Sequence, residues 1–255
     1  MYTRITICFS LLVMLASASQ AQVVQIPDAG FRQALIKKGV DTNGDGQIQL
    51  AEAQKVTKLY LDGGKGVEFS SMEGIKSFTN LVEFGTYEIR MKHADVQGMT
   101  SLKRLYLQAG GIESVNIKGC SNLEHLYLTG NRLTSLDISE HRRLTELYVP
   151  YNQLTDLVIS DYPNLEKIAV KENKISNCRI TGCPRLNFLD ISKNNIAGRL
   201  DLSVFPELVY FSADRNPITA VNITGLSKLE SFSCLYCSIV TLNLSGAERL
   251  KDLIW

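Results

Sequence analysis

The stretch SNLEHLYLTGNRLTSLDISEH, residues 121–141, is followed by RRLTELYVPYNQLTDLVISDY (142–162) and PNLEKIAVKENKISNCRITGC (163–183). The three segments have the same length and carry apolar residues at the same offsets. From residue 79 onward the chain repeats in steps of 21 residues, apart from one step of 22 at 184–205. A fixed short period predicts a solenoid, because one unit cannot bury its own leucines whereas stacked units form a continuous core.

Each unit follows the pattern LxxLxLxxNxLxxLxIxxx, in which two leucines flank one outward residue. Leu126 and Leu128 alternate with Tyr127, so this segment is predicted to be a strand whose two leucines point inward. Equivalent strands then stack in parallel, one per coil. The second apolar half of the unit predicts a thin opposite side of short extended or 3₁₀ turns, without full helices.

An asparagine follows the strand at the same position in five successive units: Asn131, Asn152, Asn173, Asn194 and Asn216. The chain turns inward there, and its backbone N–H and C=O groups would be buried without partners. Because an asparagine amide both donates and accepts hydrogen bonds, a column of these side chains is predicted to connect successive coils.

The repeat length, the leucine positions and the asparagine column resemble the leucine-rich repeat family over residues 56–255. Second halves such as LDIS (136–139) are similar to those of secreted bacterial members, of internalin-like style. The resemblance implies a repeat solenoid with a parallel β-sheet on its concave face.

The segment DTNGDGQIQLAE, residues 41–52, fits the EF-hand pattern D-x-N-x-D-G-x-I-x-x-x-E and occurs once. Its predicted Ca²⁺ ligands are Asp41, Asn43, Asp45, Gln47 through its carbonyl, Gln49 through water and Glu52. Predicted helices flank it at 28–39, with Asp28 as N-cap, and at 50–59. We expect residues 22–55 to form a helix–loop–helix cap that calcium stabilises. The alternatives are a polar turn that binds no ion, and a dockerin, which would need a second loop.

The first 21 residues read as a signal peptide. Arg4 precedes a twelve-residue apolar run (5–16), which is too short to span a bilayer, and cleavage is expected after Ala21, with Ala18 as second choice. A short membrane anchor is the alternative. We expect an exported protein that is secreted, periplasmic or associated with the cell surface, with no transmembrane span in its mature chain. Loss of Arg4 changes the formal net charge from +1 to 0, which argues against nucleic acid as a partner.

Five cysteines follow the predicted cleavage site, and their odd number and irregular spacing argue against a disulfide framework. Cys178 and Cys234 occupy apolar positions of the repeat, Cys237 takes the asparagine slot, and Cys120 and Cys183 close their units at one corner. These positions predict buried thiols. The alternative is that Cys234 and Cys237, spaced C-x-x-C, form a redox or metal pair.

Aromatic residues gather on the outward face of the predicted strands: Tyr60, Tyr87, Tyr106, Tyr127, Tyr148, Phe188 and Tyr210. Tyrosines on an exposed sheet offer large contact area with few rotors, which favours a surface that binds a protein ligand. The alternatives are a carbohydrate platform, a structural or assembly component, and rings that only brace neighbouring strands. We expect no enzyme, because the pair His125 and Glu146 would lie open to water.

Overall fold

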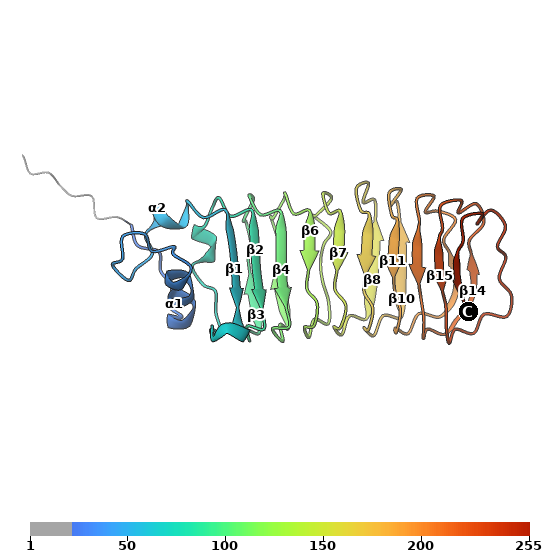
Figure 1. Ribbon diagram of the computed structural model, residues 1–255, viewed down its shortest axis with the longest axis horizontal. Helices are drawn as coiled ribbons and strands as arrows, with labels where there is room; N and C mark the ends of the chain where they lie inside the picture. The colour runs from blue at the N-terminus through green and yellow to red at the C-terminus, as the bar shows by residue number, and fades with distance from the viewer. Residues whose placement is uncertain (1–21) are drawn as a thin grey trace, which may run out of the picture.

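The computed structural model describes residues 22–255, so the predicted signal peptide lies outside the described residues. The coils stack into a rod, and each contributes one strand to a ten-stranded parallel sheet, here called the long sheet (Figure 1). Its strands in order are β1 (Lys58–Asp62), β2 (Glu83–Tyr87), β4 (Arg104–Gln108), β6 (His125–Tyr127), β7 (Glu146–Tyr148), β9 (Lys167–Ala169), β11 (Phe188–Asp190), β13 (Tyr210–Ser212), β15 (Ser231–Ser233) and β16 (Asp252–Ile254). The predicted leucine-rich repeat solenoid is confirmed.

The strands of the long sheet keep one register along the rod. Leu126 pairs with Leu105 on one side and with Leu147 on the other, and all three side chains are buried. The longer unit does not disturb this register, because Asp190 still pairs with Ser212. Its extra residue is absorbed on the opposite side, where the pairing shifts between Gly198 and Arg199.

The opposite side consists of short extended segments in three separate two-stranded sheets. These pair β3 (His93–Asp95) with β5 (Ser114–Asn116), β8 (Asp156–Ser160) with β10 (Asn177–Thr181), and β12 (Gly198–Asp201) with β14 (Ile218–Asn222). The prediction of a thin side is therefore confirmed. The second-half residues of each unit form these segments. Their pairing is interrupted between the three small sheets, whereas the long sheet is continuous.

One corner of the coils carries a second polar column that the sequence analysis did not identify. Cys120 Sγ donates to the carbonyl of Val96 (3.1 Å), and His141 Nε2 lies 3.0 Å from the carbonyl of Ile117. Tyr162 donates its hydroxyl to Ile138, the matching carbonyl one coil further. Each side chain thus satisfies a backbone oxygen 24 residues earlier, as the asparagines do after the strands.

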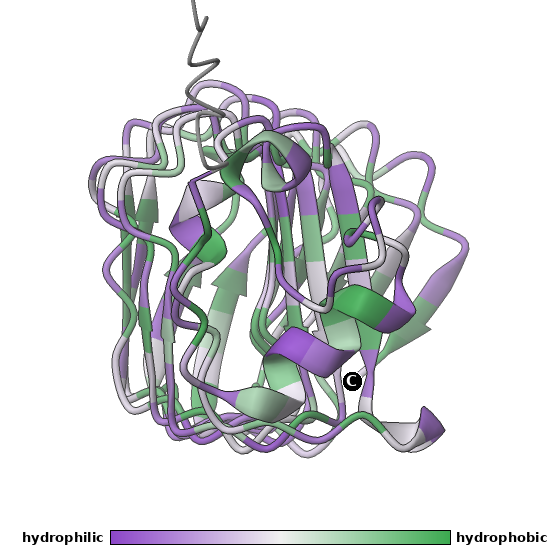
Figure 2. Ribbon diagram, turned by 90° about the vertical axis from the view of Figure 1, so that its left-hand side faces the viewer, coloured by the Kyte–Doolittle hydropathy of each residue, from purple (hydrophilic) through white to green (hydrophobic). Residues whose placement is uncertain are grey.

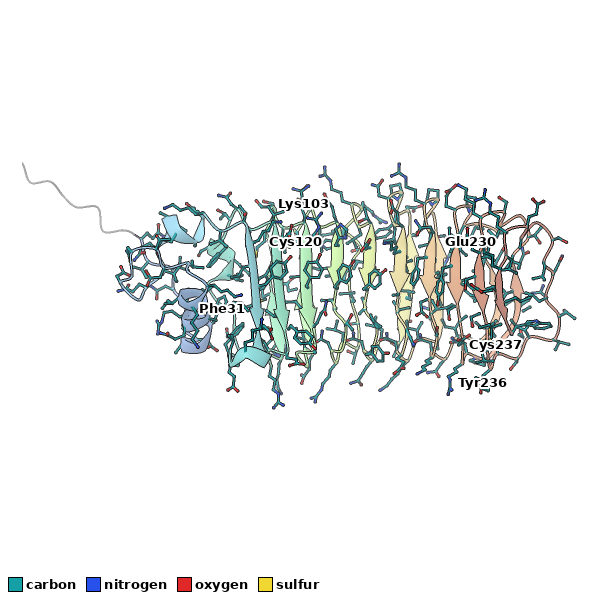
Figure 3. All side chains as sticks on the ribbon, in the orientation of Figure 1. Phe31, Lys103, Cys120, Glu230, Tyr236 and Cys237 are labelled. Atoms are coloured by element: carbon teal, nitrogen blue, oxygen red, sulfur yellow. A yellow bond between two sulfur atoms is a disulfide. The ribbon has the colours of Figure 1, made fainter. Side chains whose placement is uncertain are left out.

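A helical cap covers the N-terminal end, which faces the viewer in Figure 2. Helix α1 (Ala29–Lys37) begins where predicted, with the Asp28 carboxylate accepting from the Gly30 and Phe31 amides at 2.9 and 3.1 Å. The other Asp28 oxygen accepts from the Ser70 amide at 2.9 Å. Phe31, labelled in Figure 3, lies on α1. It packs on Phe69, with ring centroids 5.0 Å apart. The Asp28 carboxylate and the Phe31 ring thus hold α1 against residues 69 and 70 of the first coils.

The predicted helix over 50–59 is wrong beyond its first turn. Helix α2 covers only Leu50–Ala53, and β1 begins at Lys58. The carbonyl of Thr57 accepts from the amides of Val82 and Glu83 in the next coil, at 2.8 and 3.1 Å. Because Thr57 already pairs with the next coil, the chain becomes extended there and α2 ends after one turn. Two 3₁₀ turns, η1 (Gly63–Lys65) and η2 (Ile75–Ser77), complete the transition to the regular coils.

Candidate functional site

Six aromatic rings follow one another along the outward face of the long sheet; the first pair is tilted by 42° and the other pairs are stacked. In order they are Tyr60, Tyr106, Tyr127, Tyr148, Phe188 and Tyr210, with successive centroids 6.0, 4.9, 4.7, 6.5 and 4.5 Å apart. The middle rings are almost parallel: Tyr127 and Tyr148 differ in plane by 5°. Rings on adjacent strands stack at about the strand separation of 4.8 Å, which suits face-to-face aromatic contact. The two wider pairs, Tyr60–Tyr106 and Tyr148–Phe188, each reach across an intervening strand. We call these six rings the aromatic ladder.

A glycine allows the ladder to reach the first strand. Gly85 lies between Tyr60 and Tyr106 in the sheet register. A Cβ atom at Gly85 would lie 2.6 Å from Cδ1 of Tyr60, so the Tyr60 ring leans over the bare backbone. It thereby comes within stacking distance of Tyr106, two strands away.

Stacking decides which part of each ring meets the solvent. Tyr127 has a ring on both sides, Tyr106 and Tyr148, so both of its faces are covered and its edge and hydroxyl remain outward. These three middle tyrosines are half-buried, whereas Tyr60 at the start of the ladder is 44% exposed. The ladder therefore presents edges and hydroxyl groups to a partner, and free ring faces only at its ends.

Charged side chains run beside the ladder and engage its hydroxyl groups. Tyr127 donates to Glu146, and Tyr60 donates to Glu83 at 2.7 Å. Burial, and after it the bond to Glu83, raises the pKa of Tyr60 to about 12. Lys167 lies 3.0 Å from Glu146, and His125 Nδ1 lies 3.4 Å from the same carboxylate. These cross-strand pairs position the ladder.

Not all predicted positions of this face are equivalent. Tyr87 lies beside the ladder, 48% exposed, and lines a hollow of about 370 Å³ with Tyr60, Lys38 and Gln108. Ala169 and Ser212, which continue the Tyr148 column, are buried and offer no contact area, so the column does not extend the surface. Phe188 and Tyr210 carry it onward from the neighbouring column.

The asparagine column connects each coil to the one before it. Asn152 Oδ1 accepts from the Leu133 amide at 3.0 Å, while its Nδ2 donates to the carbonyls of Leu128 and Val149 at 2.8 and 3.3 Å. The same pattern recurs at Asn131, Asn173, Asn194 and Asn216. Each amide thus satisfies backbone groups that the inward turn would otherwise leave unpaired.

The loop at 41–52 holds the turns that the EF-hand pattern requires. Asp41 accepts from the amides of Gly44 and Gly46 at 2.7 and 2.9 Å, and both glycines have positive φ. Asn43 Oδ1 accepts from the Asp45 amide at 2.9 Å, and Asp45 Oδ1 from the Gln47 amide at 2.8 Å. Each of these side chains keeps further oxygen capacity for another partner.

Glu52 closes the loop from the first turn of α2. Its Oε1 accepts from the amide and the hydroxyl of Thr42, both at 2.7 Å, and its Oε2 from the Gln49 amide at 3.0 Å. Burial raises the pKa of Glu52, but these bonds outweigh it and the net pKa is lowered. Across residues 22–255, no three His, Cys, Asp or Glu side chains are gathered as a metal cluster. Amides of the loop donate to the carboxylates of Asp41, Asp45 and Glu52.

Residues ahead of α1 pair with the loop. The Val24 amide donates to Ile48 at 2.8 Å, and the Leu50 amide donates to Gln22 at 2.7 Å. Val23 and Gln49 form an antiparallel bridge. The extended segment of the loop thus finds its β partner inside the same cap.

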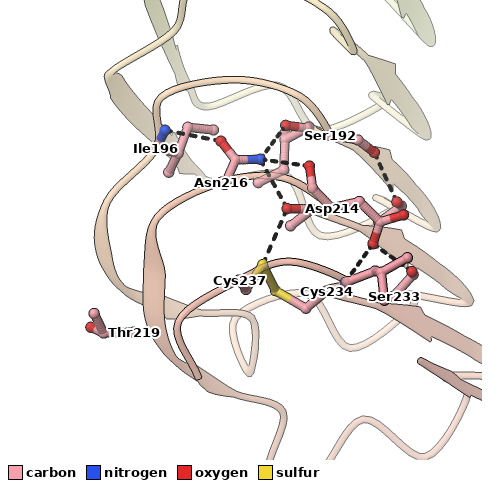
Figure 4. Close-up of a disulfide and its surroundings, with 12 residues drawn as sticks. Ser192, Ile196, Asp214, Asn216, Thr219, Ser233, Cys234 and Cys237 are labelled. Atoms are coloured by element: carbon pink, nitrogen blue, oxygen red, sulfur yellow. Dashed lines mark hydrogen bonds between the residues drawn. A yellow bond between two sulfur atoms is a disulfide. The ribbon is translucent and has the colours of Figure 1, made fainter. Parts of the chain in front are cut away.

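Cys234 and Cys237 form a disulfide with Cα atoms 5.5 Å apart, so the prediction of buried thiols is wrong for this pair (Figure 4). The tight turn after β15, with Tyr236 at positive φ, brings them within disulfide range. Cys237 Sγ sits 3.4 Å from the Ala213 carbonyl, to which Asn216 Nδ2 donates at 2.9 Å. The asparagine column ends here. The other three described cysteines are free: Cys120, Cys178 and Cys183.

Comparisons with known proteins agree with this architecture. The family model described as Leucine Rich Repeat matches residues 122–142. Three proteins of Listeria monocytogenes with solved structures are similar, and each match covers 90% of this chain. They are InlP (20% identity, TM-score 0.63, 68% of its chain), internalin C2 (19%, 0.60, 93%) and the functional domain of InlJ, which includes a cysteine ladder (20%, 0.58, 61%).

At 19–20% identity, these structural similarities show the fold alone. The protein is a leucine-rich repeat solenoid of internalin-like architecture, with repeats of about 21 residues. It spans about three fifths of the InlJ chain. No curated protein matches the sequence. Within residues 22–255, no helix is long and apolar enough to cross a membrane.

Proposed function

We propose that this protein is an exported binding module that engages a protein partner through the long-sheet face. The observation that carries the proposal is the aromatic ladder, six rings in contact that offer a row of edges and hydroxyl groups. Rigid aromatic side chains add contact area at low entropic cost, and tyrosine is enriched where protein interfaces bind most strongly. His125 and Glu146 lie on an open face, so we propose binding and not catalysis.

The same geometry favours a protein over a carbohydrate. An aromatic platform for a sugar needs free ring faces, whereas the faces of Tyr127 are covered by Tyr106 and Tyr148. Edges and hydroxyl groups suit backbone and side-chain partners of a polypeptide. A glycan that uses ring faces would reach only the two ends of the ladder.

Affinity capture with the exported protein tests the proposal. The triple variant Tyr106→Ser, Tyr127→Ser, Tyr148→Ser removes the middle of the ladder but no buried leucine. It should remain folded by circular dichroism and lose the partner that the native protein captures. Tyr151→Ser is the matched control, since Tyr151 is 49% exposed and lies outside the ladder.

The outcomes separate the alternatives. Retained capture by the triple variant, together with a lower melting temperature, would mean that the rings only brace the strands. Selective binding to a glycan array, lost in the same variant, would favour the carbohydrate function. A variant that assembles on the cell surface as the native protein does, with no partner captured by either, would favour a structural component.

We also propose that Ca²⁺ stabilises the N-terminal cap. The loop supplies only hard oxygen donors, which suit this ion, in EF-hand order: Asp41, Asn43, Asp45, Gln47, Gln49 and Glu52. When bound, the ion would offset the negative charges of the three carboxylates. Because the segment Gln22–Val24 pairs with the loop, a second hand is not needed. The role proposed is structural, at the end of the solenoid.

Melting in calcium and in chelator tests this proposal. Calcium at 100 times its dissociation constant should add about 2.7 kcal/mol to the free energy of unfolding. Asp45→Asn keeps the oxygen that bonds Gln47 but removes a ligand charge, so it should abolish or strongly weaken the dependence. Asp62→Asn is the control, because Asp62 closes a similar turn with Gly64 outside the loop. Equal melting in both solutions, with no heat of calcium binding, would reject the proposal.

A further inference from the structure

The opposite side of the solenoid opens between two neighbouring coils. Strand β10 pairs only with β8, and β12 pairs only with β14, so the described residues form no ladder between β10 and β12. On the long sheet the same two coils stay paired through β9 and β11. The coils therefore diverge from one side to the other, and two strand edges without partners face each other across the opening.

The opening uncovers positions that are buried in neighbouring coils. Leu157 and Ile159 of β8 are buried, whereas their register partners Cys178 and Ile180 in β10 are half-exposed. Leu200 in β12 is half-exposed too. The repeat places apolar side chains here for burial, and in this coil pair no neighbouring strand covers them.

The opening has depth. A hollow of about 250 Å³, space for about eight water molecules, extends to Leu189 and Ile191, two core residues from the far side of the coil. Its walls are Ile180 and Leu200, with the Cys178 thiol beside them. A comparable hollow at 115–118 and 137–141 is lined largely by polar and charged groups. The hollow between β10 and β12 is the apolar one of these two.

The rim of the hollow is positively charged. Arg179 and Arg199 project from β10 and β12, are exposed, and have neither an ion-pair nor a hydrogen-bond partner for their guanidinium groups among residues 22–255. The Asp201 carboxylate lies on the same rim and accepts hydrogen bonds from Ser203 (2.6 Å) and Asn222 (2.9 Å); its one negative charge leaves the net charge of the rim positive. Two free arginines thus stand on either side of an apolar slot.

We propose that the gap between β10 and β12 binds an extended polypeptide segment in which apolar and acidic residues alternate. A strand edge without a partner is a template for strand addition, and here two edges flank one slot. Side chains of a strand alternate between faces. Apolar side chains of the segment would enter the hollow while its carboxylates meet Arg179 and Arg199. This site is separate from the long-sheet face and does not depend on its function.

Cys178 reports on occupancy of the slot. Of the five described cysteines it is the one that is neither buried nor in a disulfide. A chain carrying Cys8→Ser therefore offers one accessible thiol to a maleimide, and Cys178→Ser supplies the blank. Burial raises the pKa of Cys178 to about 11, so labelling is followed above neutral pH. The probes are four: an acetylated, amidated peptide Glu-Val-Glu-Val-Glu, its lysine counterpart Lys-Val-Lys-Val-Lys, a version with proline at the central glutamate, and decanoate.

The acidic peptide should slow labelling of Cys178 by about tenfold at saturation, because an added strand covers the thiol. The lysine peptide and the proline peptide should protect little, since one reverses the charge and the other removes a main-chain donor. Equal protection by all three peptides, or protection by none, would overturn the proposal. Protection by decanoate alone would assign the slot to an amphiphile and overturn it too.

Charge reversal provides the second test. The double variant Arg179→Glu, Arg199→Glu should bind the acidic peptide at least about tenfold more weakly and should prefer the lysine peptide, because rim charges set the choice of partner. Lys174→Glu is the control, since Lys174 is exposed on the same coil outside the slot. If the folded double variant still prefers the acidic peptide, Arg179 and Arg199 do not select the segment by its charge, and the proposal is wrong.

Discussion

The long sheet and the opposite side are built from the same repeats, yet one is continuous over ten strands and the other is in three pieces. On the long sheet, two inward apolar columns pack each coil on the next, and the asparagine column adds hydrogen bonds between the coils from Asn131 to Asn216. On the opposite side the second-half residues vary, from Leu136 to Cys178 to Leu200, and only partly bury their side chains. Continuity therefore follows the side on which inward apolar side chains are buried in coil after coil.

The 22-residue unit makes the same point. Its extra residue leaves the pairing of Asp190 with Ser212 intact and shifts the pairing at Gly198 and Arg199 instead. A change in length is absorbed where the fewest interactions resist it. The long sheet can thus hold a recognition surface in place, while the opposite side changes shape between coils.

The largest difference between the two sides is expected for two leucines of one unit. Leu126→Ala on the long sheet should lower the free energy of unfolding by about 2–5 kcal/mol, since Leu126 is fully buried and its removal leaves a cavity. Leu136→Ala on the opposite side should cost under about 2 kcal/mol, because Leu136 is half-exposed. Urea titrations measure both. Equal losses would mean that the two sides contribute alike to cohesion.

The asparagine column should give the next largest effect. Asn152→Ala leaves the Leu133 amide without its acceptor and removes the donor to Leu128, which should cost about 1–3 kcal/mol. Asn152→Asp is informative as well, because it keeps the acceptor and loses the donor. Lys174→Ala on the opposite side should stay within about 0.5 kcal/mol. An Asn152→Ala effect as small as that of Lys174→Ala would show that the column does not fasten the coils.

The repeat architecture could be predicted because its signal is periodic. Leu126, Leu128 and Asn131 recur at one spacing, and each addition of a coil repeats the same burial and the same hydrogen bonds. The register of the aromatic column from Tyr106 to Tyr148 followed from the period alone. A single repeat with the correct spacing therefore carries information about many residues.

Features that occur once could not be predicted in the same way. The disulfide depends on the turn at Tyr236, and the early end of α2 depends on the bonds that Thr57 makes to the next coil. The opening beside Cys178 arises from how two coils diverge, which a one-residue difference in unit length does not specify. The orientation of the rings in the ladder could not be predicted either, because the spacing of the repeat fixes the distance between rings but not the angle between their planes.

A smaller effect is expected where the ladder crosses Gly85. Gly85→Ala places a Cβ against the Tyr60 ring and should displace it from Tyr106. The lost ring contact, about 0.2–1 kcal/mol, is offset by the lower entropy of the unfolded chain, so stability should change by under about 1 kcal/mol. Near-ultraviolet circular dichroism, which reports tyrosine packing, should change clearly. Ser231→Ala at the other end of the sheet is the control. If the spectrum of Gly85→Ala changes as little as that of Ser231→Ala, Tyr60 does not belong to the ladder.

The smallest effect concerns acid and the Glu146 carboxylate. Burial raises the pKa of Glu146, but bonds from Tyr127 and Lys167 outweigh it and the net pKa lies below the ordinary value of 4.5. A carboxylate whose pKa is lower in the folded state stabilises it fully above that ordinary value, and the contribution is lost as pH falls through the folded pKa. Melting measured from pH 7 down to pH 3 should thus show a decline that Glu146→Gln reduces, by roughly 0.5 kcal/mol for a partly exposed pair. Tyr127→Phe keeps the ring stack but removes the hydroxyl, so it should reduce the decline by less than Glu146→Gln does. If both variants decline as the native protein does, the charged column beside the ladder contributes nothing to its stability, and the rigidity of the surface rests on stacking alone.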